Sequence, residues 1–299
     1  MKMMSYTGVF RGRWWPIVFA LPQLILVLLF FYWPALVAIK WSLSLEQPFG
    51  GGSVFVGLDN FRRLLVDQDF YLALGRSGIF MLTASCSSIA IALVLAIAAD
   101  RKLKVSKFAR NMIFWPKAIA GAATGVVFLR LFGSHHGVLA WLNEISPGLW
   151  NPELNSLHAV ILVNIAFSWN NVPFDFIILL TGLQAIPENL HEAAALFGAG
   201  PWQRIWLVQL PLLTPQLFFC LVIEVSESLT GSFALIHSMT SGGPAGATNQ
   251  FVYKIYVDGF KGFDLSGSSA ESLILMALVS LMTLLQFVVL ERRVTYARG

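Results

Sequence analysis

Charged side chains are scarce in this chain of 299 residues, and their scarcity excludes several classes of protein at once. Asp, Glu, Lys and Arg make up 12% of the residues, against about 25% in soluble domains. Hydrophobic residues make up 57%, and the mean hydropathy is +0.70. So few charges cannot cover a water-facing surface of this size. The composition excludes an ordinary soluble enzyme, a disordered chain and a nucleic-acid-binding protein.

Cysteine is nearly absent as well. Cys86 and Cys220 both lie in apolar runs without a CxxC spacing, a pattern that suggests neither a disulfide framework nor a zinc site. We expect both to be small buried residues. His135 and His136 are adjacent, but no Cys or carboxylate at helical spacing completes a ligand set, so we expect no metal site. The chain also lacks a GxxxxGK[ST] run, so we expect no nucleotide cofactor in it.

Long apolar runs are what the chain has in abundance. A helix that crosses a bilayer needs about 20 apolar residues, and the runs of this sequence predict an all-α, polytopic membrane protein with six transmembrane helices. The first run is too long and too aromatic for a signal peptide. The expected spans are 14–38, 78–99, 113–132, 158–181, 212–234 and 272–290.

The basic residues predict the orientation of these spans. With the N-terminus inside, twelve Lys and Arg residues fall in inside segments and six in outside segments. Loop 100–112 contributes five of the twelve. Because basic residues accumulate on the cytoplasmic side, we expect both termini to be cytoplasmic.

The long inside segment 186–211 is unusually apolar for a loop, so it must pack against something. Pro187 and the residues after it favour the start of a helix, Gly198 favours its end, and Pro201 suits the first turn of a second helix. The segment is therefore predicted to form a helical hairpin. It lacks the basic face that a DNA-binding hairpin needs.

This hairpin resembles the EAA motif in the permease subunits of binding-protein-dependent ABC importers. The family pattern runs Glu-Ala-Ala, two variable residues, Asp-Gly-Ala, and a Leu-Pro ending. Phe197 stands where the family usually has Asp. Segments 56–61 and 241–244 resemble outside loops of carbohydrate-type permeases, and 22–25 and 253–256 resemble most the first permease subunits of sn-glycerol-3-phosphate importers. The matching motif residues are Glu192, Ala193, Ala194, Gly198, Ala199, Leu210 and Pro211.

The resemblance implies a type I ABC importer transmembrane domain in the bacterial cytoplasmic (inner) membrane. Residues 1–75 would form an N-terminal segment with the first span and an outside loop, and residues 76–291 the core permease domain. The chain would form half of a translocation pathway for sn-glycerol-3-phosphate or glycerophosphodiesters and would have no catalytic residues. Its implied partners are a second permease subunit, a dimeric P-loop ATPase that binds ATP and Mg, and an extracytoplasmic substrate-binding protein. Hairpin 186–211, including Phe197, would couple the chain to the ATPase.

Polar groups inside the spans are the candidates for the substrate pathway, because such groups are costly in a membrane unless they face a cavity or each other. Lys117 and Arg130 are the cations of the spans, and a guanidinium suits a phosphate. Alternatively, both cations reach the membrane interfaces. We expect Arg130, nearer the outside, to matter more for transport.

The remaining candidates lie on the fourth and fifth spans. Asp175 and Glu224 can pair with the two cations, bind substrate hydroxyls or form a salt bridge to the second permease. Asn170 and Asn171 interrupt the fourth span, and such breaks are tolerated where they line a cavity. Hydrogen bonding between helices is the alternative for these two amides.

Three alternatives to the importer of glycerophosphates stay open. The chain can be a permease for a neutral sugar or oligosaccharide, because sugar permeases share much of this framework. A stand-alone secondary transporter would show inverted repeats, and no clear repeat is present. A membrane enzyme would need a convergent set of nucleophile, acid and base, which the sequence does not suggest.

Overall fold

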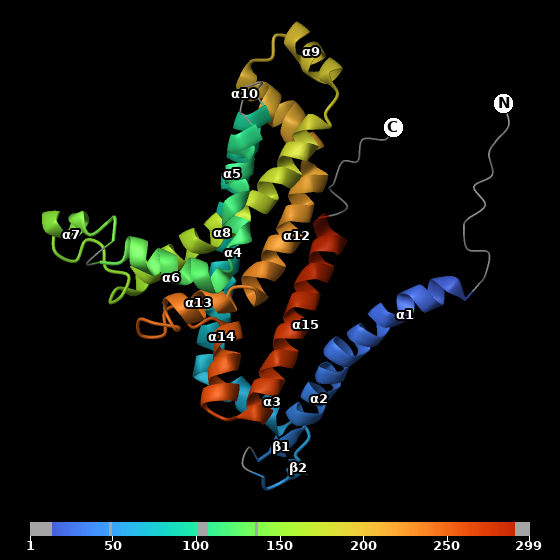
Figure 1. Ribbon diagram of the computed structural model, residues 1–299, viewed down its shortest axis with the longest axis vertical. Helices are drawn as coiled ribbons and strands as arrows, with labels where there is room; N and C mark the ends of the chain where they lie inside the picture. The colour runs from blue at the N-terminus through green and yellow to red at the C-terminus, as the bar shows by residue number, and fades with distance from the viewer. Residues whose placement is uncertain (1–13, 48–49, 101–106, 135–136, 291–299) are drawn as a thin grey trace. The chain divides into compact units, whose positions relative to one another are not determined.

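The computed structural model describes residues 14–47, 50–100, 107–134 and 137–290 (Figure 1). Its regular structure is helical apart from one short pair of strands, which confirms the all-α fold class. The elements are α1 (Trp15–Val27), α2 (Trp33–Ser42), β1 (Ser44–Glu46), β2 (Ser53–Phe55), α3 (Asp59–Val66), α4 (Gln68–Asp100), α5 (Lys107–Ala118), α6 (Gly121–Phe132), α7 (Trp141–Ile145), α8 (Ser156–Gln184), α9 (Glu188–Leu196), α10 (Pro201–Arg204), α11 (Leu210–Leu212), α12 (Thr214–Thr230), α13 (Phe233–Met239), α14 (Phe251–Tyr256) and α15 (Leu265–Leu290).

The chain divides into two compact units. The first comprises residues 1–65 and 258–273, and the second comprises residues 66–257 and 274–299. The division of the chain into a segment 1–75 and a core 76–291 stays a prediction.

The first unit contains an apolar helix followed by a strand pair. The helix runs from Ile17 to Ser42, with a π-helical turn between α1 and α2. β1 then pairs antiparallel with β2, with Ser44 opposite Phe55. The buried amide of Asn60 on α3 donates to the backbone oxygens of Ser42 and Ser44 at 2.9 and 3.0 Å. This side chain therefore fixes the path of the chain between the helix and the strands.

The second unit is built on the packing of α4 against α8. A stripe of small, fully buried side chains at four-residue spacing on α4 lets the helices approach closely. The Ser87 and Ser168 hydroxyls meet at 2.7 Å, and Thr83 donates to Asn164 at 2.9 Å, which adds polar links between the two helices. The small residues of the stripe are Ala84, Ser88, Ala92 and Ala96.

Two apolar clusters fill this second unit. One surrounds Phe80, Phe128 and Phe167, where α4, α6 and α8 meet. The other surrounds Phe176 and Leu213, where α4, α8 and α12 meet. Because these side chains come from several helices, the clusters hold the helices of the unit against one another.

Helices long and apolar enough to cross a membrane are confirmed for most of the expected spans. Among the described residues four qualify alone, and a fifth span results if the bent pair Pro201–Leu212 and Thr214–Thr230 counts as one. The two parts of that pair meet at an angle of 67°. A total of six spans is compatible with this arrangement. The four single helices are Ile17–Ser42, Gln68–Asp100, Ser156–Gln184 and Leu265–Val288.

The expected single span over 113–132 is corrected by the structure, which divides it into α5 and α6. Pro116 in the last turn of α5 has no N–H to donate, and α6 begins afresh at Gly121. α6 instead packs against α13. A Cβ at Gly125 would lie 2.8 Å from the Leu235 backbone oxygen, so only glycine allows this approach. Packing against α13 thus replaces continuation of α5.

Candidate functional site

The predicted hairpin forms from α9 and α10, as its local signals indicated. α9 ends with Gly198 at a φ of +80°, a conformation that glycine adopts without strain. The Ala199 N–H then donates to the Ala194 carbonyl at 3.0 Å, which closes the helix end. The Gly200 N–H donates to the side chain of Gln203 at 2.8 Å and so caps α10. The hairpin is therefore a defined structure with its own hydrogen bonds.

The surface of this hairpin is apolar at its tip. Leu196 is 89% exposed and Phe197 92% exposed, and Glu192 is exposed on the same helix. Ala193 and Ala194 are half-buried, so they support the hairpin rather than its tip. Further exposed apolar side chains on the second arm are Trp202, Trp206 and Leu207.

The second arm of the hairpin continues directly toward α12. From α10 the backbone passes through a π-helical turn, Ile205–Gln209, into α11, which contains Leu210 and Pro211. Leu213 is fully buried at the bend before α12. Because only the buried Leu213 separates this arm from α12, a displacement of the hairpin can pass into a membrane-spanning helix.

Four of the six predicted pathway residues come together in the middle of the second unit. The Lys117 Nζ donates to the Asn171 Oδ1 at 2.7 Å, and its charge acts on both Asp175 and Glu224. The two carboxyl groups interact with each other and with the Cys220 thiol. The Asp175 oxygens have no well-formed hydrogen bond among the described residues. Lys117 itself is exposed, so this polar cluster reaches the surface of the subunit.

Lys117 lies in the last turn of α5, and its side chain reaches across to α8. Asn171 occupies the middle of the 29-residue α8. Lys117 is therefore bonded to a buried amide deep in the fold, which argues against the alternative that it reaches a membrane interface.

Asn170 and Arg130 lie apart from this cluster. The Asn170 amide donates to the carbonyls of Pro116 and Ile119 at 2.9 and 3.0 Å, which are backbone groups at the break between α5 and α6. It thus matches the helix-to-helix alternative. Arg130 is an exposed side chain in the last turn of α6. Both remain predicted pathway residues that the structure does not bring to Lys117.

Cys220 is a member of the cluster that the sequence reasoning placed only in the core. It is fully buried, one helical turn before Glu224, whereas Cys86 is exposed, so the expectation of burial is wrong for Cys86. The sequence does contain a signal for this cluster, because polar residues occur in pairs at four-residue spacing within apolar helices. Asn171 with Asp175, and Cys220 with Glu224, place two such pairs on facing helices. Ser228, buried one turn further on, continues the polar face of α12.

The arrangement has no metal-binding cluster within the described residues, where no group of three or more His, Cys, Asp or Glu side chains is placed to hold an ion. His135 and His136 lie outside the described residues. The same applies to Arg101, Lys102 and Lys104 of loop 100–112. The cluster instead combines one cation, an amide, a thiol and two carboxyls.

Comparison with known proteins agrees with the geometry. A family model described as "Binding-protein-dependent transport system inner membrane component" matches residues 78–296. A protein of Rhizobium meliloti (strain 1021), the "sn-glycerol-3-phosphate transport system permease protein UgpA", is 40% identical over 288 residues. That match covers 96% of this chain and 98% of the relative.

Two solved structures share the fold. The structure of a bacterial ABC transporter involved in the import of the acidic polysaccharide alginate matches with a TM-score of 0.80 at 20% identity. The match covers 93% of this chain and 96% of the other. A bacterial alginate ABC transporter in complex with its alginate pentasaccharide-bound periplasmic protein matches with a TM-score of 0.78 at 20% identity, covering 91% and 92% of the two chains.

Proposed function

Because the chain belongs to the family of inner membrane components of binding-protein-dependent transport systems, we propose that it is one permease subunit of an ATP-driven importer and forms half of its pathway. Its proposed substrates are sn-glycerol-3-phosphate and glycerophosphodiesters. The observation that carries this substrate is the nearly end-to-end similarity to a permease named for sn-glycerol-3-phosphate. Family membership decides against a stand-alone secondary transporter and against a membrane enzyme.

The polar cluster at Lys117 supports a path for an anion. A phosphate in a low-dielectric path is strongly disfavoured unless a cation meets it, and Lys117 is an exposed cation bonded to the middle of α8. Asn171 holds the ammonium in place through a 2.7 Å hydrogen bond. Asp175 and Glu224, both fully buried, lie behind the ammonium and balance its charge. In this role the cluster binds the substrate briefly and performs no chemistry on it.

The partners follow from the division of labour in such importers. A dimeric P-loop ATPase binds ATP and Mg and receives the hairpin tip at Glu192 and Phe197. A second permease completes the pathway, and an extracytoplasmic binding protein delivers the substrate. The apolar surface of Leu196 and Phe197 supports a protein partner there, since such a patch is unfavourable in water. Both termini are cytoplasmic in this proposal, as the distribution of basic residues predicts.

Transport by the purified complex tests the proposal. This chain, its partner permease, the ATPase and the binding protein are reconstituted into proteoliposomes and given radiolabelled sn-glycerol-3-phosphate, glycerophosphocholine or maltose. We expect ATP-dependent uptake of the two phosphate esters and none of the sugar. Uptake of maltose alone would show that the substrate is a neutral sugar. Uptake without the ATPase would show that the chain is not part of an ATP-driven importer.

A further inference from the structure

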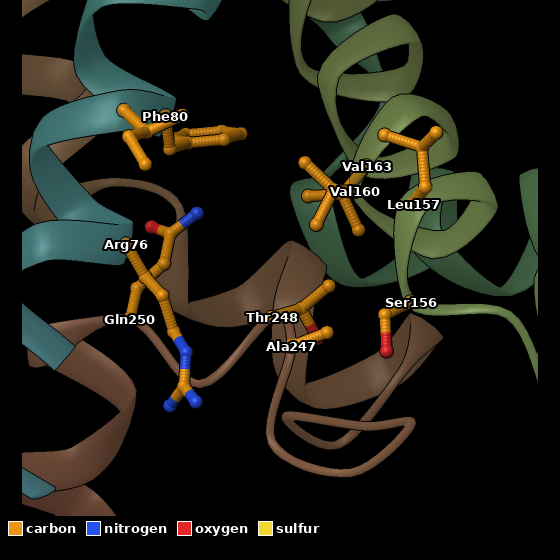
Figure 2. Close-up of a pocket in the computed structure, with 10 residues that line it drawn as sticks. Arg76, Phe80, Ser156, Leu157, Val160, Val163, Ala247, Thr248 and Gln250 are labelled. Carbon is orange, nitrogen blue, oxygen red and sulfur yellow. The ribbon is translucent and has the colours of Figure 1, made fainter. Parts of the chain in front are cut away.

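A cavity with a mainly apolar lining and a few polar side chains lies at the end of α8 opposite the hairpin. It has a volume of about 300 Å³ and opens between α4, the start of α8 and the loop before α14. Val160 and Val163 of α8 form one side of it, and Phe80, Arg76 and Gln250 line it from the other side (Figure 2). The volume is at the small end of the range for ligand pockets, which suits a small molecule or a headgroup.

Arg76 is the charged group of this cavity. Its guanidinium packs against Gly246, where an added Cβ would lie 3.5 Å from the Arg76 Nη1. Among the described residues, the carboxylates that form ion pairs do so with other basic side chains, and none pairs with Arg76. A half-buried guanidinium without a carboxylate has an unmet preference for an oxyanion, which it binds with two parallel N–H donors.

Gln250 and Ser156 add donors around the same space. Gln250 is 3% exposed, and its Oε1 accepts from the Ser232 hydroxyl at 2.8 Å, which fixes the amide. Its amide nitrogen is directed into the cavity (Figure 2). Ser156 is the first residue of α8, so its hydroxyl lies beside the positive end of a 29-residue helix. Three kinds of donor and no lining acid favour an anion.

We propose that this cavity is a phosphate-ester site, in which Arg76 holds the phosphate at one end, and Gln250 with the apolar side chains around Phe80 holds the organic part at the other end (Figure 2). The inference rests on the proposed function for its biological role, as a docking point before the central cluster. The chemistry fits two sources of phosphate ester. One is the transported glycerophosphate, and the other is the headgroup of a membrane phospholipid.

Binding in the assembled complex tests the site. The complex, purified in a phosphate-free detergent, carries Lys117→Met to remove the central cation and is titrated with radiolabelled sn-glycerol-3-phosphate and with glycerol. We expect Arg76→Gln to weaken glycerophosphate binding about tenfold or more, because a charged hydrogen-bonding partner is lost. Glycerol binding should not change. Arg76→Lys should lose less, and Arg62→Gln, at an exposed arginine outside the cavity, is the matched control.

A parallel measurement separates the two sources. Native mass spectrometry counts phosphatidylglycerol bound to the complex with and without Arg76→Gln. Lost lipid with unchanged glycerophosphate binding assigns the cavity to a phospholipid, and the converse assigns it to the transported ester. If neither ligand depends on Arg76 or responds to Arg76→Lys, the inference is wrong.

The same complexes in proteoliposomes keep this result distinct from the proposed function. Normal glycerophosphate uptake together with Arg76-independent binding would remove the cavity site and leave the importer standing. If the complex binds phosphate esters through Arg76 but transports none of them, the cavity site stands and the proposed importer function is wrong.

Discussion

The hairpin tip and the middle of α8 depart in opposite directions from the rule that apolar residues lie inside and polar ones outside. At the tip, Leu196 and Phe197 turn large apolar groups outward. In the middle of α8, Asp175 is fully buried, as is Glu224 on α12. Each arrangement costs free energy in an isolated subunit, and binding of a further group lowers that cost. The tip needs a protein surface, and the buried polar groups need a cation and a polar ligand.

The largest effect is expected from disrupting the hairpin tip. Glu192→Lys reverses a charge on an exposed face, and Gly198→Asp puts a side chain at a φ of +80°, where it is strained. We expect both variants to insert normally and to lose uptake in the reconstituted importer. Glu144→Lys, which reverses another exposed carboxylate on α7, is the control and should transport normally. Normal uptake in both hairpin variants would show that the tip is not a coupling surface.

A somewhat smaller effect is expected from removing the central cation. Lys117→Met takes the ammonium from Asn171 and from the two carboxyls. We expect basal ATP hydrolysis to persist while substrate-stimulated hydrolysis falls about tenfold or more. Arg130→Gln should retain most of its response, because Arg130 lies outside the cluster. This order reverses the one that the sequence suggested, and a larger loss in Arg130→Gln would restore it.

Asn170 and Asn171 are adjacent, but Asn170 bonds to the backbone at the α5–α6 break and Asn171 bonds to Lys117, so substitutions can separate a structural role from a pathway role. Asn170→Ala removes the donor to two backbone carbonyls at the α5–α6 break, and we expect a loss of about 1–3 kcal/mol in stability. Thermal unfolding in detergent measures this, and uptake per folded complex should stay near normal. Gln184→Ala, at an exposed amide at the end of the same helix, is the matched control and should unfold at the normal temperature. An altered substrate KM in Asn170→Ala would instead make this amide a pathway residue.

The smallest effect on activity is expected from labelling for topology. In a background without Cys86 and Cys220, a cysteine at Ser241 should react with an impermeant thiol reagent added from outside. A cysteine at Ser106, in the segment outside the described residues, should react only after the membrane is opened. Both variants should transport normally. Labelling in the reverse order would invert the orientation.

The sequence predicts what depends on local chemistry. Gly198 and Pro201 mark the ends of the hairpin helices because their backbone preferences hold in any surroundings. The apolar runs identify the long helices for the same reason. The presence of Lys117, Asn171, Asp175 and Glu224 within spans is also visible, since polar residues there are rare.

The sequence does not predict what depends on contacts between distant segments. The division of 113–132 into α5 and α6 needs Asn170 and the approach of α13 to Gly125, neither of which is local. Arg76 looks like an ordinary loop-side cation until the segment before α14 folds against it. Likewise, the separate surroundings of Asn170 and Asn171 arise because adjacent residues of a helix face different neighbours.

The α5–α6 break has a consequence for biosynthesis. Neither helix is long enough to cross a bilayer alone, and each carries a cation that costs about 3 kcal/mol at the centre of a membrane helix. The amide that satisfies Lys117 is made 54 residues later. The segment that emerges first from the ribosome therefore waits for α8 before it has a stable place in the membrane. Insertion of this region is cooperative, and damage to α8 is expected to strand α5 and α6 as substrates for membrane proteases.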